Sequence, residues 1–163
     1  MEDKPKNESF TDEEFLRVKE TAEIFYKTVP EVYCPYFKEK INLNAKGLDH
    51  IKFKSWQKAR TRADQFMRLK SLRLIPEILT NSKTLQGVCH TNILEKKKIN
   101  SRWENRLCEV SYYEFIAVIE KKRIKIIVKQ IEGGEKHFWT IIPYWKMDNF
   151  NRRVLHEGDP END

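Results

Sequence analysis

Long hydrophobic runs are missing from this sequence. No apolar stretch approaches the roughly 20 residues that a helix needs to span a bilayer. The first ten residues, MEDKPKNESF, also lack the apolar segment of a secretory signal peptide. We therefore expect a cytoplasmic protein that has no membrane partner.

Cysteine is scarce and poorly placed for a metal site or a disulfide framework. The three cysteines, Cys34, Cys89 and Cys108, are odd in number, widely spaced and without a CxxC pair. His90 directly follows Cys89, a spacing that is poor for binding one ion together. We expect free, buried thiols, no zinc site and no cofactor.

Positive charge is what the sequence has in excess. Charged residues make up 34% of the chain, and the formal net charge is +6. The ends are acidic, with TDEE near the start and EGDPEND at the end, whereas residues 38–129 hold most of the lysines and arginines. Such a concentrated basic segment favours a polyanionic partner, and nucleic acid in particular.

The first part of the chain carries a helical pattern. Thr11 followed by Glu14 matches a capping box, and apolar residues recur at helical spacing until Pro30 ends the segment. Residues 41–43 then alternate like a short strand. This pattern predicts one N-terminal helix followed by extended chain.

Residues 59–83 contain the strongest helical pattern. Thr61 and Asp64 are candidate caps for this helix. Pro76 cannot continue a regular helix, so we expect a break there and a short second helix. One or two strands are expected within residues 87–100.

The pattern changes to β-structure after residue 112. Three runs rich in Ile, Val, Tyr, Phe and Trp within residues 112–142 predict an antiparallel meander with two-residue turns at Lys121-Lys122 and Gly133-Gly134. We expect an α+β fold, with N-terminal helices packed on a C-terminal antiparallel sheet of about four strands. The predicted division is an N-terminal helix in residues 1–30, an α+β domain in residues 31–146 and a polar tail in residues 147–163.

Two-residue turns fix which residues face each other in the meander. The predicted pairs are Glu114 with Lys129, Lys129 with Phe138, Ile127 with Thr140, and Val128 with Trp139. Because side chains alternate along a strand, Val128 and Trp139 fall on a hydrophobic core face. The opposite face carries Glu114, Lys125, Lys129 and Thr140.

Three of these polar side chains are expected to lie close together. Glu114, Lys129 and Thr140 fall within about one diagonal step of one another, roughly 5–8 Å between Cβ atoms. A lysine and a hydroxyl group can bind a phosphate, and a carboxylate can accept a proton. Alternatively, Glu114 and Lys129 form an ion pair on an exposed face, and Thr140 is there as a strand former. His137 is expected on the other face beside Gln130, in a structural or exposed position.

His50 is the second candidate for proton transfer, because an imidazole titrates near neutral pH. It lies between two apolar residues, so it is alternatively a core histidine bonded to the backbone. Arg60 and Arg62 open the long predicted helix, where an incoming phosphate is favoured by the helix dipole and by both cations. Alternatively, both arginines are simply solvated.

Two further segments carry basic residues. Lysines and one arginine alternate with Trp56 in residues 52–60, which suits phosphate contacts combined with base stacking. Residues 95–106 hold the second basic cluster, composed of Lys96, Lys97, Lys98, Arg102 and Arg106. Such runs are also common on solvated surfaces that bind nothing.

The segments GLDHIKFK, RTRADQFMRLKSLRLIPEIL and the closing meander together resemble the barnase, EndoU, colicin and RelE-like nuclease superfamily. The resemblance covers roughly residues 33–146 and is closest to phage-associated and small bacterial members. It implies N-terminal helices, a four-stranded antiparallel sheet and metal-independent cleavage of RNA. It also implies a toxin that an immunity or antitoxin protein holds in check.

The resemblance assigns roles to particular residues. His50 matches the early histidine of the superfamily, Lys129 or else Lys125 matches its strand cation, and Thr140 in FWTIIP matches its late hydroxyl residue. Glu114 is similar to the strand carboxylate of barnase. No second histidine lies near His50, as an EndoU-type mechanism would use.

These observations give one leading function and two alternatives. The leading function is a metal-independent endoribonuclease; the alternatives are a non-catalytic RNA-binding module and a basic protein-interaction domain. We expect four catalytic residues to converge in one cleft, namely His50, Glu114, Lys129 and Thr140. The expected substrate-binding residues are Arg60, Arg62 and Lys125.

Overall fold

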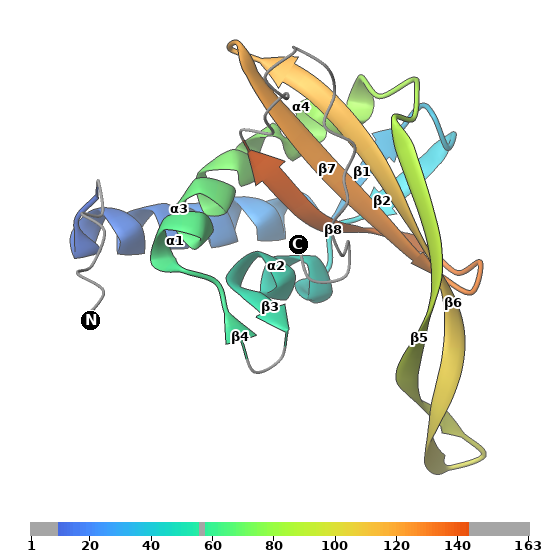
Figure 1. Ribbon diagram of the computed structural model, residues 1–163. Coiled ribbons are helices and arrows are strands. Elements are labelled where there is room, and N and C mark those ends of the chain that lie inside the picture. The colour runs from blue at the N-terminus through green and yellow to red at the C-terminus, as the bar shows by residue number, and fades with distance from the viewer. Residues whose placement is uncertain (1–9, 56–57, 144–163) are drawn as a thin grey trace, which may run out of the picture.

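A six-stranded sheet with helices packed on one face forms the body of the protein in a computed structural model, which describes residues 10–55 and 58–143 (Figure 1). The helices are α1 (Asp12–Thr28), α2 (Ala45–Lys52), α3 (Arg62–Ser71) and α4 (Ile75–Thr80), with the 3₁₀ turn η1 (Leu72–Leu74) before α4. The expected α+β class is confirmed. Within these ranges no helix is both long and apolar enough to cross a membrane.

The sheet is mixed and larger than expected. Its strands run in the order β1 (Glu31–Cys34), β2 (Glu39–Asn42), β8 (Lys136–Pro143), β7 (Lys122–Ile131), β6 (Arg102–Ile119) and β5 (Gly87–Ile99). Neighbours are antiparallel except β2 and β8, which are parallel and joined at Asn42 and His137. The short β3 (Phe53–Ser55) and β4 (Lys58–Ala59) form a separate two-stranded sheet. Trp56 and the expected polar tail lie outside the described residues.

The helix boundaries follow from capping. Thr11 Oγ1 accepts a hydrogen bond from the Glu14 amide at 3.2 Å, and the Glu14 carboxylate accepts one from the Thr11 amide at 2.8 Å. Thr61 caps α3 by accepting from the Asp64 amide at 3.2 Å. The chain tightens into η1 directly before Pro76 enters α4, so the predicted capping box, cap and break are confirmed.

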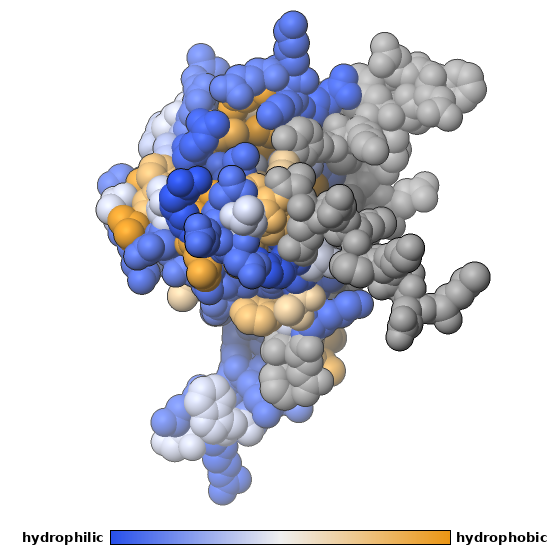
Figure 2. All heavy atoms as spheres, turned by 90° about the vertical axis from the view of Figure 1, so that its left-hand side faces the viewer, coloured by the Kyte–Doolittle hydropathy of each residue, from blue (hydrophilic) through white to orange (hydrophobic). Residues whose placement is uncertain are grey.

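The main core lies between the helices and one face of the sheet. Fully buried sheet residues Ile126, Val128 and Phe138 belong to the same cluster as Leu72 and Leu79 from the helices. The surface outside this core is largely hydrophilic on the side shown in Figure 2. Cys34 and Cys108 are buried as expected, but Cys89 is exposed because it lies on the edge strand β5.

The predicted pairing of the first hairpin is wrong by two residues. Glu120 and Lys121 form its turn, both with positive φ, and Glu114 therefore pairs with Ile127 rather than with Lys129. A shift of two residues leaves every side chain on its expected face, because the side-chain period of a strand is two. The predicted meander is confirmed, whereas the partner of Glu114 is not.

The second hairpin contains a β-bulge that the sequence pattern did not predict. Ile127 pairs with Thr140 as expected, but Val128 pairs with Phe138, so Trp139 is one extra residue in β8. Phe138 consequently joins the main core, and Trp139 lies on the other face in a cluster with Tyr112 and Ile127. The predicted core position of Trp139 is therefore wrong.

Candidate functional site

Helix α2 packs unusually close to strand β8. A Cβ atom added to Gly47 would lie 2.4 Å from the Phe138 carbonyl oxygen and 2.8 Å from the Tyr26 hydroxyl, so only glycine fits at this position. The next turn of the helix carries His50. The close approach therefore brings the His50 ring against the side chain that follows Phe138 in β8.

That side chain is Trp139, and two predicted site residues contact it. The His50 and Trp139 rings stack with centroids 4.1 Å apart and an interplanar angle of 26°. Lys129 Nζ lies 3.9 Å from the Trp139 ring centroid and 5.7 Å from that of Tyr112. Lys129 is only 3% exposed, so its ammonium group gains from both aromatic faces.

A pocket of about 640 Å³ opens beside this cluster. His50, Lys129 and Trp139 line it, together with Lys46 and Lys54 from the α2–β3 segment. Phe53 adds an exposed aromatic ring, and Asp49 and Glu95 add two carboxylates. Three lysines and two aromatic rings suit a ligand that combines phosphate groups with flat bases.

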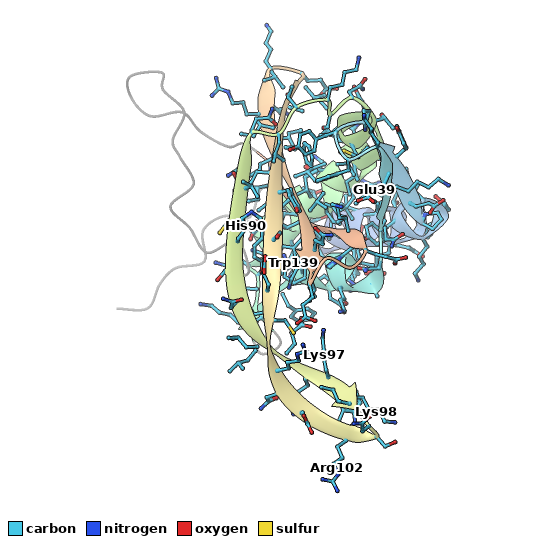
Figure 3. All side chains as sticks on the ribbon, turned by 90° about the vertical axis from the view of Figure 1, so that its right-hand side faces the viewer. Glu39, His90, Lys97, Lys98, Arg102 and Trp139 are labelled. Carbon is cyan, nitrogen blue, oxygen red and sulfur yellow. The ribbon has the colours of Figure 1, made fainter. Side chains whose placement is uncertain are left out.

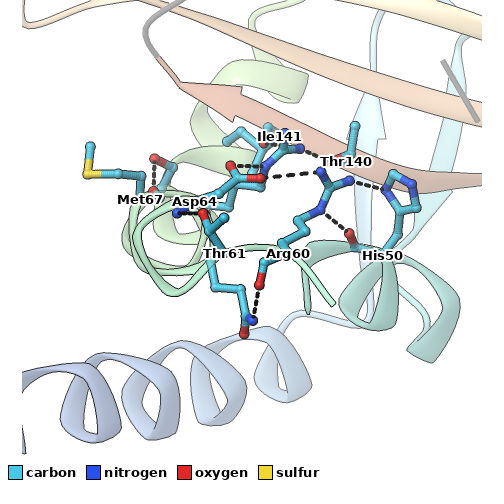
Figure 4. Close-up of polar contacts among 10 residues, drawn as sticks. His50, Arg60, Thr61, Asp64, Met67, Thr140 and Ile141 are labelled. Atoms are coloured by element: carbon cyan, nitrogen blue, oxygen red, sulfur yellow. Dashed lines mark hydrogen bonds and ion pairs between the residues drawn. The ribbon is translucent and has the colours of Figure 1, made fainter. Parts of the chain in front are cut away.

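Arg60, which does not line the pocket, forms hydrogen bonds with His50. Its Nε donates to the His50 carbonyl oxygen at 2.9 Å, and its Nη2 lies 3.4 Å from His50 Nδ1 (Figure 4). Because a guanidinium group only donates, His50 Nδ1 accepts. A neutral His50 therefore carries its proton on Nε2.

The same network continues through α3 to strand β8. Asp64 accepts from Arg60 Nη1 at 3.4 Å and from Arg68 Nε at 2.7 Å. Arg68 Nη1 in turn donates to Thr140 Oγ1 at 2.7 Å and to the Ile141 carbonyl oxygen at 3.3 Å. A chain of polar contacts thus links His50 to Thr140 through three charged side chains.

The predicted catalytic residues are only partly brought together. Among the described residues, His50 and Lys129 line the pocket, but Thr140 and Glu114 do not. Thr140 is fully buried against Arg68, and Glu114 is bonded to Lys125 at 3.4 Å. The arrangement indicates positioning and structural contacts for Thr140 and Glu114 rather than contact with a ligand in the pocket.

The predicted substrate-binding residues also lie apart. Arg60 and Lys125 are buried and, unlike Lys129, do not line the pocket. Arg62 lies 2.7 Å from Asp12 and 4.8 Å from the Phe15 ring centroid, which directs it toward α1. Lys46 and Lys54 take the exposed positions at the pocket that Arg60 and Arg62 were expected to fill.

His137 lies beside the pocket rather than on the opposite face. It pairs with Lys129 in the sheet, and its ring meets that of Trp139 edge to face at 6.1 Å. Burial, with smaller contributions from the nearby Lys129 and Lys46 ammonium groups, lowers the pKa of His137 to about 4. The ring is therefore neutral, and its buried Nε2 has no hydrogen-bond partner among the described residues.

Sequence reasoning missed Arg68 and the bridging role of Asp64. Positions 60, 64 and 68 are spaced by four residues, the spacing of side chains on one face of a helix, so this signal was present, although Arg60 itself lies just before α3. The central position of Trp139 had no such signal, because it depends on the bulge.

Within residues 10–55 and 58–143, no group of three or more His, Cys, Asp or Glu side chains is arranged to hold a metal ion. Comparisons with protein-family models, curated proteins and solved structures find no match to this chain.

Proposed function

We propose that the pocket binds single-stranded RNA and cleaves it without a metal ion. One observation carries the proposal: His50 and Lys129, which are far apart in the sequence, meet on Trp139 at the wall of one pocket. Metal-free cleavage of RNA needs a group that transfers a proton and a cation that stabilises the phosphate charge. The pocket offers both beside aromatic rings.

The pocket residues divide into two roles. Lys129, Lys46 and Lys54 bind phosphate oxygens, and Phe53 offers an exposed ring for base stacking. His50 Nε2–H donates a hydrogen bond to a phosphate oxygen and stays neutral, and the leaving 5′-oxygen takes its proton from water. Asp49 and Glu95 are the carboxylates that can accept the proton of the 2′-hydroxyl group.

The fold proposed for this function is a variant of the barnase- and RelE-like arrangement, with β1 and β2 added at one edge of the meander. The superfamily resemblance supports a toxin-like activity and an inhibitor or antitoxin protein as partner. An inhibitor of this kind would act by covering the pocket.

Cleavage of an end-labelled RNA in EDTA tests the proposal. Removing Lys129 (Lys129→Ala) should slow cleavage by about 100- to 1,000-fold, the usual effect of losing one transition-state donor. Removing His50 (His50→Ala) should also slow it by about 100- to 1,000-fold, because one donor to the phosphate is lost. His90→Ala and Lys83→Ala are matched controls, because both residues are exposed and outside the pocket. Wild-type rates in the His50→Ala, Lys129→Ala double variant would contradict the proposal.

A second candidate function is RNA binding without cleavage. It is favoured by the buried contacts of Thr140 and Glu114, which leave the pocket with fewer catalytic groups than expected. Salt-sensitive RNA binding by a wild-type protein that leaves RNA intact would select this function. If the protein neither binds nor cleaves RNA at low salt, the protein-interaction alternative remains.

A further inference from the structure

Strands β5 and β6 continue well past the sheet. Their ladder runs to the pair Ile99 and Arg102, whereas β7 pairs with β6 only from Val110 onward. Residues 94–107 therefore form a two-stranded arm that projects from the body (Figures 1 and 3). Six residues on each strand give it a length of about 20 Å. Asn100 and Ser101 form the turn at its tip, both with positive φ.

The two faces of the arm differ. The inner face is tied to the body, because Lys97 and Arg106 pair with Glu132 and because Glu95 lines the pocket. The outer face carries large apolar side chains in the open: Leu94 is 72% exposed, Trp103 is 70% exposed and Leu107 is 60% exposed. Pairing of Leu94 with Leu107 and of Lys98 with Trp103 places all four on this face.

The arm is also strongly basic. Five lysines and arginines stand against two glutamates between residues 94 and 107. Within the described residues, no carboxylate lies at ion-pair distance from Lys96, Lys98 or Arg102. Figure 3 shows Lys98 and Arg102 at the far end of the arm, away from Trp139.

We propose that the outer face of the arm binds the RNA strand that enters the pocket. The proposal rests on the proposed function, because it extends the same substrate beyond the same site. Glu95 lines the pocket from the inner face of the arm, so an RNA strand that leaves the pocket reaches the arm and crosses its edge to the outer face. Trp103 stacks on an unpaired base, and Lys96 and Lys98 bind the adjoining phosphates.

Charge and shape favour single-stranded RNA over other occupants of this face. An exposed indole beside two lysines is the combination by which proteins hold single strands, since every base offers a flat face and every linkage a phosphate. A duplex keeps its bases stacked inside and cannot offer one to Trp103. The arm therefore makes the substrate class a single strand longer than the pocket alone can hold.

Fluorescence polarisation of a labelled 12-nucleotide 2′-O-methyl RNA tests the arm, because this ligand lacks the hydroxyl group that cleavage requires. Trp103→Ala should raise Kd by about 5- to 150-fold, the equivalent of one lost stacking contact. Lys96→Ala with Lys98→Ala should lower the slope of log K against log salt by about 1.4. Tyr33→Ala and the pair Lys38→Ala, Lys83→Ala are matched controls with exposed side chains away from the arm.

Wild-type Kd and salt slope in both arm variants, with unchanged circular dichroism, would overturn the proposal. So would a change from dimer to monomer in Trp103→Ala at unaltered RNA affinity, because the face would then bind a second copy of the chain. The cleavage assay tests the proposed function separately: cleavage that does not depend on His50 and Lys129 would contradict that function without bearing on the arm.

Discussion

Trp139 gives the buried Lys129 ammonium group a partner at the pocket wall. A desolvated cation over an indole ring gains about 2 kcal/mol or more, which offsets part of the cost of removing the charge from water. The same ring stacks against His50. Trp139 of β8 therefore contacts and orients both His50 of α2 and Lys129 of β7.

His137 should make the stability of the protein depend on pH. Its pKa is about 4 in the folded chain, against about 6.5 for an unperturbed histidine. Between these values the unfolded chain binds a proton that the folded chain does not. The contribution is therefore fully present above pH 6.5 and is lost as the pH falls to about 4, on the order of 3 kcal/mol in total.

Urea unfolding at pH 7.5 and at pH 4.5 measures this loss. His137→Gln removes the titrating group and should reduce the difference between the two pH values. His90→Gln, at an exposed histidine of β5, should keep the wild-type difference. An equal pH dependence in all three proteins would contradict the assignment to His137.

At the scale of elements, α3 joins the pocket to the sheet through Asp64. This carboxylate is the shared partner of two arginines whose side chains are 0% and 8% exposed. Removing one partner of a buried charge costs far more than removing an exposed pair, because the remaining charge stays desolvated.

Asp64→Asn should therefore lower the free energy of unfolding by about 3 kcal/mol, near the lower end for a buried pair because Asp64 itself is partly exposed. Asp12→Asn is the matched control: it breaks the exposed pair with Arg62 and should cost less than about 1 kcal/mol. Denaturant unfolding measures both. Equal effects would show that the network does not stabilise the fold.

The meander shows which features of an element a sequence pattern can predict and which it cannot. Alternating apolar residues predicted its three strands, because each buries one face. Phe138 and Trp139 are adjacent and both aromatic, so the pattern cannot say which of them fills the core. The close packing of α2 on the Phe138 backbone at Gly47 is a tertiary contact, and it is absent from any local pattern.

At the scale of the whole molecule, the sequence predicted helices before a sheet, but it did not predict that the early strands β1 and β2 join that sheet beside β8. The parallel contact of β2 with β8 joins Asn42 to His137, and no turn chemistry signals a pairing between segments so distant. The candidate site was predictable as far as His50 and Lys129. Its remaining members, Lys46 and Glu95 among them, are brought in by the packing of α2 and by the length of β5.

A chain that ends at residue 135 should fail to fold cooperatively. It lacks β8, which lies between β2 and β7 and carries the fully buried Phe138 and Ile141. Thermal unfolding followed by circular dichroism should show a sigmoidal transition for the full chain and none for the fragment. A cooperative transition in the fragment would mean that the first seven strands and the helices form a stable unit.

The parallel contact between β2 and β8 also sets when the pocket is completed during synthesis. The α2 wall of the pocket leaves the ribosome early, but Trp139, which contacts both His50 and Lys129, belongs to the last strand described. Pairings this distant in sequence form late, after the long intervening segment has been ordered. Under the proposed function, a growing chain cannot cleave RNA at this pocket before β8 has left the ribosome, and an inhibitor can bind in the meantime.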